Sequence, residues 1–156
     1  MATSTLIQFL GDGITSPTGA GADTMNRRQV ETFISGAAIV AGDVVMLDTS
    51  KTGADRALFI KQASAVATGN PLAIGVALNA AAAAGEQVRV VVAGYVEGVN
   101  CSAAGATAVG KPLVAGTVAG EVEEANTTDT SGLFGVALEA FGGATNSVAI
   151  HIFKRF

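Results

Sequence analysis

Short apolar runs alternate with turn residues along most of the chain, from Val30 onward. In the clearest run, Val88, Val90 and Val92 occupy alternate positions, while Arg89 breaks the opposite face. A period of two is typical of a strand that packs one face on a core and leaves the other partly in water. Repeated short runs of this kind, separated by Gly, Pro, Asn and Asp, predict an all-β fold, a small barrel or sandwich.

Seven apolar runs are predicted to form strands. They cover residues 44–47, 57–61, 72–78, 87–96, 113–118, 133–138 and 147–153. Between two of them, Asn79 and Gly85 enclose five alanines, and alanine is the best helix former. Five residues cannot stabilise a longer helix alone. We therefore expect one helical turn there, capped by Asn79 and ended by Gly85.

The strand pattern occurs twice. The segment 74–78 (Ile-Gly-Val-Ala-Leu) recurs sixty positions later as 134–138 (Phe-Gly-Val-Ala-Leu). At the same offset, the alternating run around Val90 recurs around Ile150, so these two residues are expected at matching inward positions. The sequence thus predicts a single β domain, residues 31–156, built from two similar halves at about 37–99 and 103–156.

Residues 1–30 differ from the rest and are expected to form an extended N-terminal arm. One apolar run, containing Leu6, Ile7, Phe9 and Leu10, is followed by a stretch rich in Gly and Asp without helix or strand periodicity. Such a segment buries too little to offset the entropy of ordering it alone. The four apolar side chains could instead bind a partner protein by adding a strand to an exposed sheet edge.

Charge and hydrophobicity restrict the possible partners. Only 14% of the residues are charged, against about 25% in typical soluble domains, while 49% are hydrophobic. Part of this apolar surplus is expected in subunit contacts. No run reaches the roughly 18 to 20 apolar residues of a spanning helix, and no secretory signal opens the chain, so we expect no membrane and synthesis in the cytosol. A net charge of −4 with scattered basic residues argues against nucleic acid as a partner.

One stretch imitates a nucleotide site. Residues 105–111 match most of the phosphate loop G-x-x-x-x-G-K-[ST], but Pro112 stands where a Ser or Thr hydroxyl and the start of a helix are required. We interpret the stretch as a turn leading into a strand, and Lys111 as a residue without a nucleotide role.

Other candidate residues for chemistry lack partners in the sequence. His151, the one histidine, lies on the strand face opposite Ile150, and nothing nominates a triad or a metal site around it. Cys101 is the one cysteine, which rules out an intrachain disulfide or a metal knuckle. An acidic group, Glu121, Glu123 and Glu124, is expected to be solvated. We therefore predict no catalytic residue, no cofactor, no metal and no enzymatic activity.

An ordered set of short motifs resembles the tailed-bacteriophage capsid cement or decoration proteins. The set is Ala-Gly-Asp-Val-Val at 41–45, Gly-Val-Ala at 75–77, and Ala-Gly-Glu at 84–86 leading to Val88, Val90 and Gly94. The second half repeats this order more loosely with Gly-Lys-Pro-Leu at 110–113 and Gly-Val-Ala at 135–137. The resemblance covers roughly residues 36–153.

The resemblance implies a non-enzymatic homotrimer on the outer surface of the virion. It would sit at local three-fold positions of the icosahedral head and bridge neighbouring subunits of the major capsid protein, after synthesis in the host cytoplasm. Two alternatives stay open: another phage structural β protein, from a tail or baseplate, and a carbohydrate-binding surface module. A sugar site normally exposes aromatic side chains, whereas this chain lacks Trp and has Tyr95 as its sole tyrosine.

Overall fold

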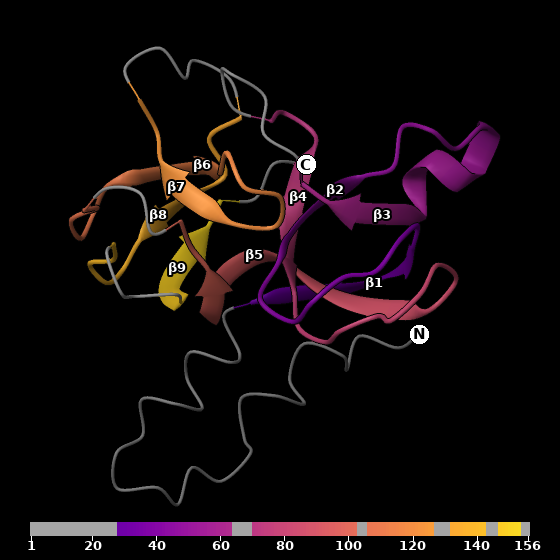
Figure 1. Ribbon diagram of the computed structural model, residues 1–156, viewed down its shortest axis with the longest axis horizontal. Helices are drawn as coiled ribbons and strands as arrows, with labels where there is room; N and C mark the ends of the chain where they lie inside the picture. Colours follow the sequence, from indigo (N-terminus) through magenta and orange to yellow (C-terminus); the bar gives the residue numbers. More distant parts are fainter. Residues whose placement is uncertain (1–27, 64–69, 103–105, 127–131, 143–146, 154–156) are drawn as a thin grey trace, which may run out of the picture.

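A computed structural model describes residues 28–63, 70–102, 106–126, 132–142 and 147–153 of the 156-residue chain. These residues form two connected barrels, drawn in purple to magenta and in orange to yellow in Figure 1. The elements, in chain order, are β1 Gln29–Ser35, β2 Val44–Leu47, the 3-10 helix η1 Gly53–Ala57, β3 Phe59–Gln62, β4 Ala73–Ala77, β5 Gln87–Asn100, β6 Pro112–Ala115, β7 Val122–Glu124, β8 Gly135–Ala137 and β9 Ser147–Ile152.

The first barrel is closed by five strands. Its strand order is β1-β3-β2-β4-β5, and β1 also pairs with β5, so the sheet returns to its start. The pairing of β1 with β3 is parallel, and the other pairings are antiparallel. The predicted all-β fold and barrel are confirmed.

Strand β5 belongs to both barrels. Its first part pairs with β1 and β4, and from Gly94 onward it pairs with β9. Gly94 and Gly98 have φ angles of 94° and 69°, which side chains rarely adopt, and the register with β9 shifts between Val96 and Val99. Such irregularities bend a strand. They let one long strand leave the first barrel and enter the second.

The second barrel repeats the first, strand for strand. Its order is β5-β9-β8-β6-β7, and a parallel bridge between Cys101 and Val122 joins β7 back to the end of β5. The registers also correspond. Val45 pairs with Gly75 as Leu113 pairs with Gly135, and the pair Ala77–Val90 has its counterpart in Ala137–Ile150. The sequence repeat is therefore a structural repeat.

The glycine inside the repeated motif is required by the close approach of two strands. A Cβ atom on Gly75 would lie 2.1 Å from the carbonyl oxygen of Val91, and one on Gly135 would lie 2.7 Å from that of His151. No side chain fits at such distances without moving the backbone. A glycine in a strand interior often marks a close approach of this kind.

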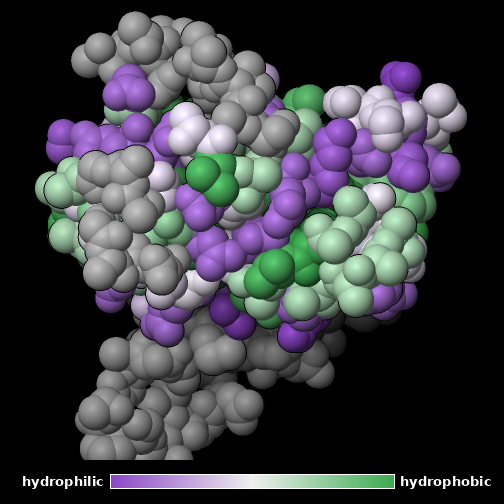
Figure 2. All heavy atoms as spheres, in the orientation of Figure 1, coloured by the Kyte–Doolittle hydropathy of each residue, from purple (hydrophilic) through white to green (hydrophobic). Residues whose placement is uncertain are grey.

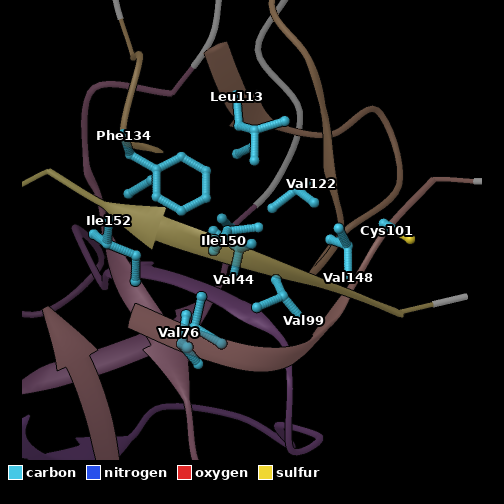
Figure 3. Close-up of a cluster of buried hydrophobic side chains, with 14 of the residues drawn as sticks. Val44, Val76, Val99, Cys101, Leu113, Val122, Phe134, Val148, Ile150 and Ile152 are labelled. Atoms are coloured by element: carbon cyan, nitrogen blue, oxygen red, sulfur yellow. The ribbon is translucent and has the colours of Figure 1, made fainter. Parts of the chain in front are cut away.

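Two buried clusters form the core. One fills the first barrel, with Val88 and Val90 among its members. The other combines the interior of the second barrel with side chains from the outside of the first. In Figure 3, Val44 and Val76 of the first barrel lie in the same cluster as Ile150 of the second. The barrels thus share a core rather than touching at their surfaces.

Several strand predictions need correction. The prediction for β2 has the observed bounds, whereas β1 and β7 were not predicted, because their sequences lack a clean apolar alternation. Ala57, predicted to open a strand, ends η1 instead, and the strand predicted over 113–118 ends at Ala115.

The helical turn predicted over 79–85 is wrong. This segment forms a loop in which Ala81 makes an antiparallel bridge with Ile39. The Asn79 side chain accepts a hydrogen bond from the Arg89 amide at 2.9 Å. The Glu86 carboxylate accepts hydrogen bonds from two amides of the same loop, those of residues 82 and 83. These tertiary and side-chain bonds override the helix propensity of the alanines.

Candidate interaction surfaces

The two barrels meet where the start of β2 contacts the hairpin between β6 and β7. The Val44 amide donates to the Gly120 carbonyl at 2.7 Å, and the Gly120 amide donates to the Ala63 carbonyl at 3.0 Å. On the other side, the Asn100 amide at the end of β5 donates to the Gly42 carbonyl at 2.9 Å. Backbone hydrogen bonds therefore connect the barrels on both sides of this turn.

Asp43 lies at the centre of this joint and is 4% exposed. Its carboxylate accepts hydrogen bonds from the Val40 amide at 2.7 Å, from Gln62 Nε2 at 2.7 Å and from Asn100 Nδ2 at 2.9 Å. The first two donors belong to the first barrel and the third to the end of β5. A buried carboxylate requires such donors, because water is not there to solvate it.

The matching turn of the second barrel carries Lys111 in place of Asp43. Gly110 has a φ of 83° and donates its amide to the Ala137 carbonyl at 2.8 Å, as Gly42 does to Ala77. Lys111 forms an exposed ion pair with Glu124 at 2.9 Å. Strand β6 begins at the next residue, so a turn into a strand stands where a phosphate loop would need a helix.

A row of four side chains crosses the outer face of the second barrel. Pro112, Val136, His151 and Tyr95 are successive partners on β6, β8, β9 and β5. His151 is exposed, on the face predicted from the sequence, and its ring makes an edge contact with Phe153, which is 44% exposed. This face is mixed, with aromatic, aliphatic and polar groups side by side.

Tyr95 is the most perturbed titratable group of this face. Its hydroxyl donates a hydrogen bond to the Glu97 carboxylate. That bond, burial and the charges of Glu97 and Glu139 raise the pKa of Tyr95 to about 12. The tyrosine therefore stays protonated at physiological pH and has a fixed hydrogen-bond direction.

One end of the first barrel presents an exposed apolar patch, which we call the alanine patch. It is visible as the green area over the 36–42 and 79–86 loops in Figure 2. Its exposed members are Ala37, Ala38, Val40, Ala41, Ala80, Ala82, Ala83 and Ala84. The bridge between Ile39 and Ala81 joins the two loops, and the Glu86 carboxylate is turned onto loop amides. Contiguous exposed apolar patches often mark contacts with other proteins.

The other predicted residues are placed as follows. Leu6, Ile7, Phe9 and Leu10 lie outside the described residues, so the arm stays a prediction. The acidic group is not a free loop, because β7 includes two of its three members; Glu124 pairs with Lys111, and Glu123 accepts a bond from the Thr117 amide at 3.1 Å. Cys101 is buried, and burial followed by the charge of Glu121 raises the pKa of its thiol.

Within the described ranges, no group of three or more His, Cys, Asp and Glu residues could hold a metal ion. The same ranges contain no helix that is long and apolar enough to cross a membrane.

Sequence reasoning missed the roles of Asp43 and of the alanine patch. Asp43 lies inside the Ala-Gly-Asp-Val-Val motif at 41–45, whereas the alanines were predicted to form one helical turn.

Comparisons with known proteins agree with this architecture. Among solved structures, the N base of head fiber gp8.5 of bacteriophage phi29 is similar, with 19% sequence identity and a TM-score of 0.57 over 81% of this chain and 95% of that chain. At this identity the likeness shows a shared fold. No curated protein matches the chain. The profile of the phage cement protein family matches residues 25–152. Because this match spans most of the sequence, the chain belongs to the phage cement protein family and is a structural protein of the phage capsid.

Proposed function

We propose that this protein decorates the outer surface of an icosahedral phage head and stabilises contacts between subunits of the major capsid protein. The observation that carries the proposal is the family match over residues 25–152. The similar fold in a protein described as the base of a phage head fiber is in line with a place on the head. A cement protein holds a lattice by many repeated contacts, whose combined strength exceeds that of any single one.

The protein acts by contact rather than by chemistry. Support comes from the mixed outer face of the second barrel and the alanine patch, which offer area for protein contacts. Among the described residues, the ring of His151 makes an edge contact with the aromatic ring of Phe153. A decoration role needs nothing more than surface, whereas catalysis needs positioned acids, bases or nucleophiles.

The active unit is a homotrimer. The low charge content and the apolar surface support self-association, and oligomers with closed symmetry are common. The number three follows from the resemblance to cement proteins. Light scattering at micromolar concentration should give a trimer mass, and a monomer mass would remove this part of the proposal without touching attachment to the capsid.

The N-terminal arm makes the attachment. The arm was predicted over residues 1–30, but its last two residues belong to β1, whose first residue, Gln29, lies beside Ala93 near the junction of the two barrels. Leu6, Ile7, Phe9 and Leu10 add a strand to a sheet edge of the shell and bury their side chains there. Deletion of residues 2–25 should leave the oligomer folded and weaken attachment sharply, and Phe9→Asp should do much of the same damage.

A binding assay with undecorated capsids tests the proposal. The purified protein should co-sediment with the capsids, appear on their outer surface in electron micrographs and raise the temperature at which they break open. A glycan array tests the alternative of a surface carbohydrate-binding module. Absence of binding to capsids, with binding to tails or glycans, would replace the decoration role by one of the alternatives. If the truncated protein decorated with wild-type affinity, the barrels would make the attachment.

A further inference from the structure

We infer that the turn Gly42–Val44 of the first barrel completes the second barrel, and that Asp43 is the positioning residue that holds it there. The two barrels would then behave as one rigid body. The inference comes from comparing how each barrel closes the seam between its first and third strands: β1 and β3 in the first barrel, the end of β5 and β7 in the second.

The seam of the first barrel is closed by its own strands. The Ile34 amide donates to the Leu58 carbonyl at 2.9 Å, and the Gly36 amide donates to the Ile60 carbonyl at 2.6 Å. Both bonds join the end of β1 to the segment around the start of β3. No residue of the second barrel takes part in either bond.

The seam of the second barrel keeps only one of these bonds between its own strands. The Ser102 amide donates to the Val122 carbonyl at 2.9 Å, as Gly36 does to Ile60. The counterparts of Ile34 and Leu58 are Asn100 and Gly120. Each bonds instead to the inserted turn, since Asn100 donates to the Gly42 carbonyl and Gly120 accepts from the Val44 amide. Residues of the first barrel therefore stand between the two strands.

Asp43 holds this turn in the seam. Its carboxylate accepts from Gln62 on the first barrel and from Asn100 on the second, at 2.7 and 2.9 Å. It also lies against the hairpin, because a Cβ atom on Gly120 would be 2.7 Å from Asp43 Oδ1. Removal of the carboxylate leaves these half-buried donors without their acceptor, which penalises the closed joint. The strand ladders within each barrel do not use this group.

The consequence for function rests on the proposed decoration of capsids. A protein that bridges neighbouring subunits must keep its contact surfaces at a fixed separation. Strand β5 is the covalent connection between the described parts of the two barrels, and Gly94 lies where it changes barrels. Without the Asp43 bonds, this seam opens more readily, and the spacing between the outer faces is held less firmly by the shared core and the remaining backbone bonds.

Amide hydrogen exchange of the free protein, followed by NMR, tests the inference. In Asp43→Ala, the joint amides of Val44, Asn100 and Gly120 should exchange at least about tenfold faster, because local opening exposes them. Amides of the β8–β9 ladder should keep their protection. Lys111→Ala is the matched control, since Lys111 occupies the same turn of the second barrel without a joint, and it should leave the joint amides unchanged.

Asn100→Ala removes a donor to Asp43 on the side of the second barrel and replaces Asp43→Ala if that variant does not fold. It should speed the exchange of the same joint amides. Unchanged joint protection in the folded variants would overturn the inference, and so would an equal loss of protection in both barrels, which would mean that Asp43 supports the whole fold. The measurement needs no capsid. If wild-type protein failed to bind capsids, the proposed function would fall while the exchange result stood. If it binds, Asp43→Ala should still attach but stabilise the shell less.

Discussion

Val44, Val76 and Val91 on the outside of the first barrel are fully buried, whereas among their counterparts on the second barrel Pro112 and His151 are exposed and Val136 is half-buried. Both rows occupy the same register positions of the same strand order. The difference arises because the first row packs against the other barrel, while the second row ends the repeat. Position in the molecule, and not the strand pattern, decides whether an outer face becomes a core.

The two polar residues at the corresponding turn also differ between the barrels, since they lie in the joint in the first barrel and on the surface in the second. In the first barrel Asp43 accepts a bond from Gln62, and a third group from the second barrel joins them. In the second barrel Lys111 and Glu124 form an ion pair whose side chains are 50% and 33% exposed. Exposed ion pairs contribute little to stability. The repeated pair therefore stabilises a joint in one barrel and only a surface in the other.

The largest expected effect separates the two repeated glycines. Gly75→Ala should lower the free energy of unfolding by more than about 3 kcal/mol, since its Cβ would lie 2.1 Å from the carbonyl oxygen of Val91 and 2.8 Å from a methyl group of Val90. Gly135→Ala should cost about 1 to 3 kcal/mol, because its contact with the neighbouring strand is less close. Urea denaturation measures both. An equal cost at the two sites would contradict the comparison.

The inward positions should behave alike. Val90 and Ile150 are both fully buried, so Val90→Ala should cost about 2 kcal/mol and Ile150→Ala about 3 kcal/mol, the difference being one methylene group. Thermal denaturation measures the pair. If one substitution were neutral while the other unfolded the protein, the repeat would lack energetic equivalence in the two barrels.

Replacing an outer-row residue by its counterpart from the other barrel should cost much more stability in the first barrel than in the second. Val91→His places an imidazole in the shared core and should cost about 3 kcal/mol, whereas His151→Val on the exposed face should stay within about 0.5 kcal/mol. Urea denaturation of each single variant measures the cost. A large loss from His151→Val would mean that the outer face of the second barrel contributes to the folded core.

The smallest effect at neutral pH concerns Tyr95, which pairs with His151 as Val30 pairs with Val91. Because its folded pKa is raised to about 12 from 10.0, its contribution to stability is complete below pH 10 and is lost between pH 10 and 12. The chain has one tyrosine and no tryptophan, so ultraviolet absorbance reports this group alone. Glu97→Gln should bring the titration back toward pH 10. A wild-type midpoint near 10 would exclude the hydrogen bond.

Much of the fold could be predicted from local pattern. The alternation around Val90 and Ile150 gave the inward faces, and the sixty-residue offset gave the duplication. Strands β1 and β7 escaped prediction because neither shows a clean apolar alternation, and the partners of β1 are also distant in the chain. The alanine loop was misassigned for a related reason. Its conformation is set by Ile39, Asn79 and Glu86 rather than by alanine propensity.

The sequence by itself determined the all-β class, the repeat, the turn in place of a phosphate loop and the resemblance to cement proteins, because these depend on periodicity and on short ordered motifs. The tertiary structure alone decided that β5 is shared, that Val91 is buried while His151 is exposed, and that Asp43 joins the barrels. Each of these depends on which surfaces meet after the strands have paired. A period of two says which residues share a face, but not what will cover that face.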